Sequence, residues 1–578
     1  MRQPANIVYS FGDFRLDPAE RLLLRNGDAL SLTPKVFDAL VLLVENAGHL
    51  VEKDEFMKCL WPETFVGDDT LAQNISLLRK VLADGTGVPE CIVTVPRRGY
   101  RFIAPVLLSR ELSAGHHEPI ESVAVLPFSN GSLDADTEYL SDGITEGVIN
   151  SLSQVQNLLV IARSTAFRYK HEETDPQKAG NDLRVNAVVV GKLLLRGDTV
   201  IVQAELVDVA TGSQLWGGQF KRKAVDVFAL QDDLSKEISE KLRVRLSGDQ
   251  VKRLAKRQTE DAEAYRLYLK GRYHWNKRNP DAMRRAIECF HKALDSDPGY
   301  ALAYTGLADT YNHLSFLNVV PPRDAMPKAK GAASKALEMD DELAEAHVSL
   351  GYASFTYDGD WLAAGKHFEQ ALALNPSYSR THTFYAFYLS SLGRHEEALE
   401  LARFALDHDP ASPAVSHSLA VQLYLARQFD EAIEQAHQTL ELDANFAVAY
   451  APMAEAYLSK GMYREALPPL EKYVALSRRS AACLGLLGYS HARSGERTQA
   501  LRIIEELKDA SKHSFVPAFF FALVHTGLEE KDLAFAWLEK AHQERFNRLA
   551  YLRMEALWDP LRSDNRFTDL LRRIGIPQ

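Results

Sequence analysis

The sequence predicts a multidomain chain in which a small α+β domain and a small α/β domain precede an all-helical solenoid. One observation is a change of pattern, from short strands and helices before residue 105, through alternating strands and helices over 119–246, to helices alone from about 260. The other is an internal period of 34 residues, typical of solenoids in which each unit packs on the next. The period is marked by Ala364, Ala398, Ala432, Ala466, Ala500 and Ala534.

The composition is that of an ordinary globular protein. The 578 residues are 46% hydrophobic and 25% charged, which excludes disordered and fibrous classes and predicts several domains. The formal net charge of −11 excludes a uniformly basic nucleic-acid coat. Any contact with nucleic acid must therefore come from a local patch.

We expect a cytoplasmic protein. The four cysteines lie far apart, without the spacing of a metal or redox motif, and suit reduced thiols. The N-terminus lacks the apolar stretch of a signal peptide. The apolar runs at 39–44 and 515–524 are too short to span a membrane.

Residues 1–105 are predicted to form the α+β domain, with short strands, three helices and a closing hairpin. The third helix has one buried stripe at helical spacing, made of Leu71, Ile75, Leu78 and Leu82. Its opposite side carries amides, hydroxyls and cations, which suit base edges and phosphates. The closing hairpin, IVTVPRRGYRFI, places two arginines at its turn.

These features resemble the winged helix of the OmpR/PhoB-type DNA-binding domain, through the stretch TLAQNISLLRKVLADG and the wing that follows it. The resemblance implies that the third helix enters the major groove of DNA and that the wing reaches the minor groove or the backbone. Ser76 and Leu77 stand where this family often has arginines. The DNA contacts that the resemblance implies are Thr70, Gln73, Asn74, Arg79, Lys80, Thr94, Arg97, Arg98 and Tyr100.

A second interpretation is that the winged helix contacts proteins. Residues 1–105 hold 12 lysines and arginines against 14 aspartates and glutamates, a net charge of −2, whereas DNA-binding domains are usually basic. An arginine pair at a solvated turn also needs no function. The helix pattern and the wing together favour DNA, with a protein-interaction scaffold as the alternative.

The middle of the chain is predicted to hold a linker over 106–118 and an α/β domain over 119–248. The linker is inferred from the Gly- and Pro-containing stretch LSAGHHEP, which has no apolar period. The stretches VAVLPF, EYLSDGITEGV, GSQLW and FALQDDL resemble the TolB N-terminal-like (FlgO-like) domain, which implies no known chemistry. We expect a connecting helix over 249–264.

Residues 262–578 are predicted to form the helical array and its C-terminal capping helix. The stretch GYASFTYDGDWLAAGKHFEQALALNP resembles the tetratricopeptide repeat, and about eight such repeats fit residues 262–545. The resemblance implies a concave groove lined by the first helix of each repeat, suited to a peptide or a partner helix. The candidate groove residues are Tyr352, Thr383, Phe387, Ser390, His417, Tyr424 and Tyr489.

The sequence predicts a regulator and not an enzyme. The motifs GxxxxGK[ST], HExxH, GxSxG and CxxC are absent, and no cofactor or metal site is expected. The domain order resembles ToxR/CadC-like regulators without their membrane span. The expected partners are double-stranded DNA and a protein or signal received by the repeats or the middle domain, and self-association stays open.

Overall fold

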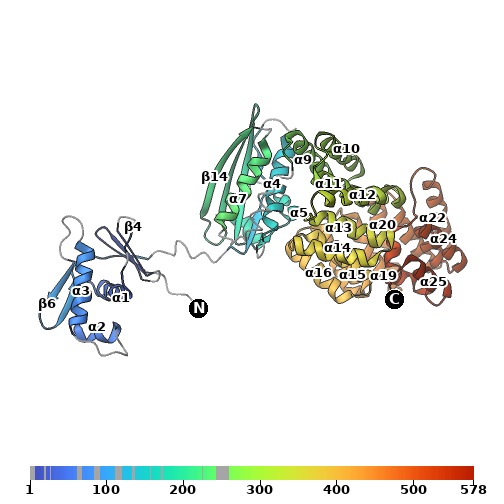
Figure 1. Cartoon of the computed structure of the whole chain (residues 1–578). Helices are drawn as coiled ribbons and strands as arrows, with labels where there is room; N and C mark the ends of the chain where they lie inside the picture. Colours follow the sequence, from blue (N-terminus) through green and yellow to red (C-terminus); the bar gives the residue numbers. More distant parts are fainter. Residues whose placement is uncertain are drawn as a thin grey trace. The chain divides into compact units, whose positions relative to one another are not determined.

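The structure is a computed structural model in which the chain forms two compact units, residues 1–118 and 119–578 (Figure 1). Each unit has its own hydrophobic core. The residues that the structure describes are 7–18, 21–25, 28–30, 32–60, 68–83, 91–110, 120–132, 137–155, 158–170, 174–223, 226–242 and 259–577.

The described residues of the N-terminal unit form three helices and two small antiparallel sheets. One sheet has the strand order β4-β3-β2-β1-β8, and the other has the order β5-β7-β6. The buried stripe predicted for the third helix is confirmed, because all four of its side chains lie in the core. The elements are β1 (Ile7–Phe11), β2 (Phe14–Asp17), β3 (Leu22–Arg25), β4 (Asp28–Leu30), α1 (Pro34–Glu45), β5 (Leu50–Glu52), α2 (Lys53–Leu60), α3 (Asp68–Ala83), β6 (Ile92–Val95), β7 (Gly99–Phe102) and β8 (Leu107–Arg110).

The predicted linker begins too early. Residues 107–110 form β8, which pairs antiparallel with β1 and sets Arg110 opposite Ile7. The linker was inferred from the composition of the stretch that follows, whereas the apolar run VLL at 106–108 continues the fold into the sheet. Residues 111–118 lie outside the described residues, as do residues 249–258 of the predicted connecting helix.

The second unit begins with a six-stranded sheet of order β11-β9-β12-β13-β14, with β10 also paired to β12. The first strands run parallel, and the β12-β13-β14 meander is antiparallel. Helices α4 and α7 pack on one face of this sheet (Figure 1). The elements are β9 (Ser122–Val125), β10 (Ser129–Asn130), α4 (Glu138–Ser153), β11 (Leu159–Val160), α5 (Arg163–Ala166), η2 (Phe167–Tyr169), α6 (Pro176–Leu183), β12 (Ala187–Arg196), β13 (Thr199–Asp208), β14 (Gln214–Lys223) and α7 (Val227–Lys241).

Helix pairs follow from residue 262, which confirms the predicted solenoid. The alanines of the 34-residue period are all fully buried, because only a small side chain lets neighbouring helices pack closely. The paired helices are α9 (Ala262–Asn276), α10 (Pro280–Ser296), α11 (Ala301–Phe316), α12 (Pro322–Met339), α13 (Ala344–Ala353), α14 (Trp361–Leu374), α15 (Ser379–Ser391), α16 (His395–His408), α17 (Pro413–Leu425), α18 (Phe429–Leu442), α19 (Tyr450–Ser459), α20 (Tyr463–Leu476), α21 (Ala481–Arg493), α22 (Arg497–Ala510), α23 (Ala518–Gly527) and α24 (Lys531–Gln543). Short elements and a last helix complete the fold: η4 (Ser354–Asp358), η5 (Ala447–Ala449), η6 (Asn547–Tyr551), η7 (Ala556–Leu561) and α25 (Asn565–Ile574).

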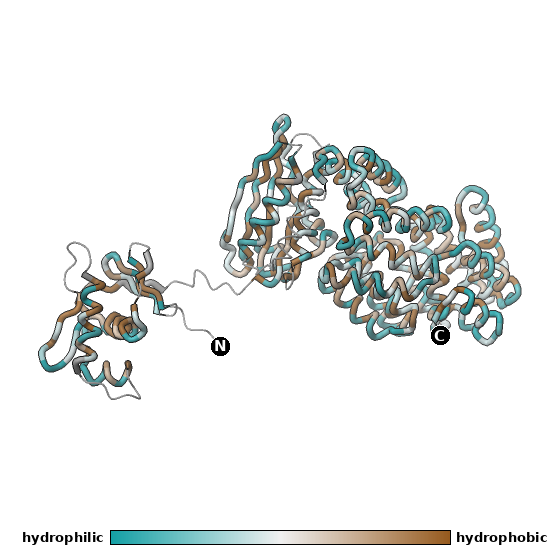
Figure 2. Tube along the Cα trace, in the orientation of Figure 1, coloured by the Kyte–Doolittle hydropathy of each residue, from teal (hydrophilic) through white to brown (hydrophobic). Residues whose placement is uncertain are grey.

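The α/β domain and the first repeats share one core. Its buried residues include Ile144 of α4 and Leu234 of α7, together with Leu269 of α9 and Tyr300 before α11. Helices α4 and α9 approach closely at Gly143, where a Cβ atom would lie 2.8 Å from the side chain of Leu269. Figure 2 shows that hydrophobic residues gather between the sheet and its helices, whereas the tips of loops are hydrophilic. The two regions therefore fold as one body.

Candidate nucleic-acid interface and the interior of the repeat array

One side of α3 is free of core contacts and carries polar groups. Gln73 and Lys80 are exposed there, and Leu77 between them is 50% exposed. Thr70 and Asn74 are half-buried at the edges of the same stripe. This face therefore presents amide, hydroxyl and ammonium groups over about three helical turns.

Arg79 ties α3 to the hairpin that follows. Its Nε and Nη2 atoms donate hydrogen bonds to the carbonyl oxygen of Ile92, at 3.1 and 3.0 Å, and Nη2 also donates to Oγ1 of Thr94 at 2.7 Å. Arg79 and Thr94, both predicted to contact DNA, are therefore hydrogen-bonded to each other. These hydrogen bonds hold the wing against α3.

The wing is the β6–β7 hairpin, and its turn carries Arg97 and Arg98, both exposed. Arg97 has a φ of +64° and stands at the tip. Among the described residues, an ion pair of 3.0 Å joins Arg98 to Glu52 on β5, and none joins Arg97. Gly99 is required here, because a Cβ atom would lie 2.0 Å from the carbonyl oxygen of Val51.

Tyr100 was predicted to contact DNA from the wing, but its side chain is buried. Its side chain is 7% exposed and packs edge-to-face on Phe56, with ring centroids 6.0 Å apart. The ring is therefore part of the domain core, because alternate residues of β7 point inward. Leu77 is not among the predicted DNA contacts. Its place on the helix side opposite the buried stripe nevertheless predicts that it is exposed.

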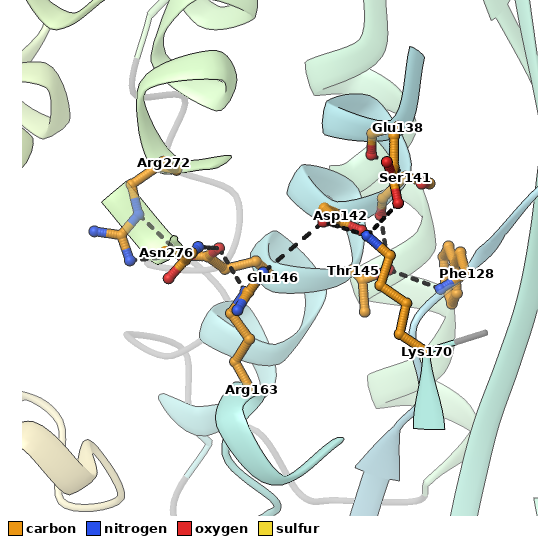
Figure 3. A network of polar contacts seen from close by, with 10 residues as sticks. All are labelled: Phe128, Glu138, Ser141, Asp142, Thr145, Glu146, Arg163, Lys170, Arg272 and Asn276. Atoms are coloured by element: carbon orange, nitrogen blue, oxygen red, sulfur yellow. Dashed lines mark hydrogen bonds and ion pairs between the residues drawn. The ribbon is translucent and has the colours of Figure 1, made fainter. Parts of the chain in front are cut away.

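In the second unit, Glu146 of α4 is the centre of a buried charge network (Figure 3). Its carboxylate accepts hydrogen bonds from Arg272 of α9, at 2.9 and 2.5 Å, and from Asn276 at 2.8 Å. Arg163 of α5 forms an ion pair with it at 3.0 Å. Burial by itself raises the pKa of Glu146, but Arg272 and Arg163 outweigh burial and hold the pKa below its usual value.

Two further buried carboxylates have partners, Asp309 within the repeats and Asp409 between the repeats and the α/β domain. Asp309 of α11 forms an ion pair with Arg380 of α15 and accepts a hydrogen bond from Ser349 at 2.6 Å. Asp409, after α16, accepts hydrogen bonds from the hydroxyls of Ser164 and Thr165. These groups are partnered inside the protein, so their arrangement indicates structural roles.

A cleft of about 140 Å³ lies beside the network, between α4, α7, α9 and the start of α13. Polar and apolar surface line it in nearly equal parts, and the polar lining includes Gln231, Arg272, Glu345 and Asn375. Asn375 is buried, and its Oδ1 atom accepts no hydrogen bond from a described residue. Burial raises the pKa of Glu345.

The chain's own C-terminal segment, residues 545–577, packs against the first helices of the middle repeats. Asn547 donates a hydrogen bond to the hydroxyl of Tyr352 at 3.1 Å. The ring of Tyr551 lies 5.9 Å from that of Phe387. Arg548 forms ion pairs with Glu455 of α19 and with Glu555. Two of the predicted groove residues, Tyr352 and Phe387, therefore contact this segment.

The remaining predicted groove residues are mostly used in packing. Ser390 is fully buried and donates its hydroxyl to Oε1 of Gln422 at 2.5 Å. Tyr424 and Tyr489 are buried, and burial raises the pKa of Tyr489 to about 12. Thr383 and His417 are half-buried. Thr383 bonds back to the carbonyl oxygen of Ser379, whereas burial and Arg548 lower the pKa of His417 to about 4.

Comparison with known proteins assigns the N-terminal unit. Residues 27–102 match the family model described as transcriptional regulatory protein, C terminal. This region is an OmpR/PhoB-type winged helix. The DNA-binding domain of Escherichia coli CadC is similar to it, with 33% sequence identity over 19% of this chain and 100% of that structure, at a TM-score of 0.17.

The regions after the winged helix are also similar to regulators. Residues 120–239 match the second domain of HilA/YgeH-like transcriptional regulators, and the likeness to the TolB N-terminal-like domain stays a prediction. The transcriptional regulator HilA of Salmonella typhimurium is 25% identical over 431 residues, which are 74% of this chain and 75% of HilA. A Rhizobium meliloti protein named "Putative adenylate cyclase 3" is 34% identical over 234 residues, and the match spans 40% of each chain.

The described residues include neither a metal-binding cluster nor a membrane-spanning helix. No group of three or more His, Cys, Asp and Glu side chains in this part of the chain is placed to hold a metal ion. No helix within the described ranges is both long and apolar enough to cross a membrane.

Proposed function

We propose that the protein is a sequence-specific DNA-binding transcriptional regulator whose repeat array receives a protein partner or a signal. The observation that carries the proposal is the exposed polar stripe of α3 beside a wing tipped by Arg97, in a domain of the transcriptional regulatory family. The names of relatives such as HilA and CadC agree with it. Binding to DNA would place the chain in the cytoplasm, and no enzymatic step is proposed.

In this proposal, α3 enters the major groove, where Gln73 and Asn74 meet base edges and Lys80 meets a phosphate or a guanine. Arg79 acts through the wing, because its hydrogen bonds to Ile92 and Thr94 hold the hairpin against the helix. The wing adds Arg97 and Arg98 at the backbone or the minor groove. Thr70 and Thr94 offer hydroxyls to phosphates.

The decisive experiment selects bound sequences from a random DNA pool with the full chain. A variant with Arg97→Ala and Arg98→Ala is compared, at two salt concentrations. We expect one enriched motif for the wild type, weaker binding by the variant, and a smaller salt dependence because fewer counterions are released. The matched control is Arg284→Ala with Arg285→Ala, two exposed arginines of α10.

Absence of any enriched motif from the folded wild-type chain would favour the alternative, an interaction scaffold in which the winged helix contacts proteins. The net charge of −2 over residues 1–105 is the observation that supports this alternative. An equal loss of DNA affinity in the wing variant and in the control would mean that the wing arginines do not contact DNA.

We also propose that a protein partner is received through the repeat groove, in competition with the C-terminal segment. Support comes from Tyr352 and Phe387, two predicted groove residues that already hold Asn547 and Tyr551. Hydrogen exchange of residues 545–561 tests this step. Faster exchange on addition of a partner is expected, whereas unchanged exchange would place the partner on another face.

We propose a small ligand as a second candidate for the signal. The cleft beside Glu345 and Asn375 is the place in the second unit that a sensor function would use, because the buried Oδ1 atom of Asn375 accepts no hydrogen bond from a described residue. A change in unfolding temperature on addition of a ligand, lost in Asn375→Ala, would support that function.

A further inference from the structure

Leu77 is an exposed apolar side chain at the centre of the proposed DNA-contact stripe. Gln73 lies one helical turn before it and Lys80 one turn after it, on the same exposed side of α3. The fold does not need Leu77, because the core stripe on the opposite side is complete and each of its four residues is at most 3% exposed. We therefore look for the role of this half-exposed leucine in binding and not in folding.

The chemistry of the major groove offers one apolar group to such a side chain. Leucine neither donates nor accepts hydrogen bonds, so it cannot read the polar edges of adenine, guanine or cytosine. Thymine presents its 5-methyl group in the major groove, and apolar side chains contact it there. We propose that Leu77 packs on a thymine methyl group and makes the protein prefer a T·A pair at one position of its operator.

This inference rests on the proposed function, and it also predicts where the thymine lies. Along a helix that rises about 1.5 Å per residue, Leu77 stands about 6 Å from Gln73. Base pairs are about 3.4 Å apart along each strand. The thymine read by Leu77 therefore lies within about two base pairs of the base read by Gln73.

The test removes the methyl group from the DNA and the leucine from the protein. The full chain first selects its motif, and each thymine of that motif is then replaced, one at a time, by deoxyuridine, which lacks only the 5-methyl group. At one position we expect about a fourfold loss of wild-type affinity, the factor that burial of one methyl group is worth. Leu77→Ala should bind the thymine and deoxyuridine duplexes equally well.

Two further variants make the outcome specific. Leu77→Met keeps an apolar side chain of similar length and should keep the methyl effect. Leu362→Ala makes the same change at a leucine of α14 that is 72% exposed, and should bind as the wild type does. The urea unfolding transition of the winged helix in each variant checks that α3 still packs in its core.

The results separate this inference from the proposed function. An enriched motif in which no thymine methyl matters, or a methyl effect that Leu77→Ala retains, would overturn the role of Leu77 and leave DNA binding in place. Failure of the wild type to enrich any motif would overturn both.

Discussion

The winged helix and the body formed by residues 119–578 use arginines in opposite ways. Arg97 is exposed at the wing tip, and Arg98 shares its charge with Glu52 at the surface. Arg548 instead is mostly covered by the body, with its side chain 25% exposed, and forms ion pairs with the buried Glu455 and Glu555. A charge that water can reach remains available to a ligand, whereas a buried charge is committed to the fold.

Among these arginines, loss of Arg548 should cost the most stability. Arg548→Met would leave Glu455 and Glu555 buried without their cation, which typically costs about 3–5 kcal/mol. We expect the urea midpoint of the second unit to fall strongly, with the winged helix unaffected.

A matched change at the surface should cost far less. Arg284→Met breaks an exposed ion pair with Asp281, one turn away on the same helix, and such pairs contribute about 0–1 kcal/mol. An equally small effect of Arg548→Met would show that the buried network is not needed for stability.

Glu146 should link the stability of the second unit to acid pH. Its pKa lies below the ordinary value of 4.5, because Arg272 and Arg163 outweigh the effect of burial. A carboxyl group whose pKa is lowered by folding contributes its full stability at pH values above its ordinary pKa. This contribution is lost as the pH falls through the pKa of the folded state. Glu146→Gln should therefore cost about 2–3 kcal/mol at pH 7 and less at pH 3.

Urea unfolding of the second unit at the two pH values measures this difference. Glu338→Gln, at an exposed pair with Lys335, is the control. A wild-type advantage over Glu146→Gln that stays constant between pH 7 and pH 3 would contradict the assignment.

The independence of the winged helix can be tested at Gly99. A methyl group added there would meet the carbonyl oxygen of Val51 at 2.0 Å, so β5 and β7 must move apart. We expect Gly99→Ala to destabilise the winged helix by about 1–3 kcal/mol, the usual range for overpacking. The unfolding transition of residues 119–578 should not move, and a shift of both transitions would mean that the two units unfold together.

The smallest expected effect distinguishes the two wing arginines. Arg97→Ala should lower the slope of log affinity against log salt by about 0.9, as loss of one phosphate contact does for B-DNA. Arg98→Ala should lower it less, because Glu52 already offsets that charge. Titrations of the selected operator at several salt concentrations measure both slopes. A larger change for Arg98 would contradict the inference from the ion pair.

The local elements and the repeat register could be predicted from the amino-acid sequence. The stripe from Leu71 to Leu82 predicts which side of α3 is buried, and the alanine period predicts the helix pairs, because both depend on spacing along one or two helices. The exposed position of Leu77 follows from the same spacing.

How distant segments meet depends on the packing of the whole fold and could not be predicted from local patterns. The contact of Asn547 with Tyr352 joins residues 195 positions apart, and the bonds from Arg79 and the burial of Tyr100 depend on how the hairpin packs on the helices. No period or motif encodes such pairings, since they arise from the superhelical path of the whole array and from the shape of the core. The sequence therefore names the groups that could act, and the packing selects those that remain accessible.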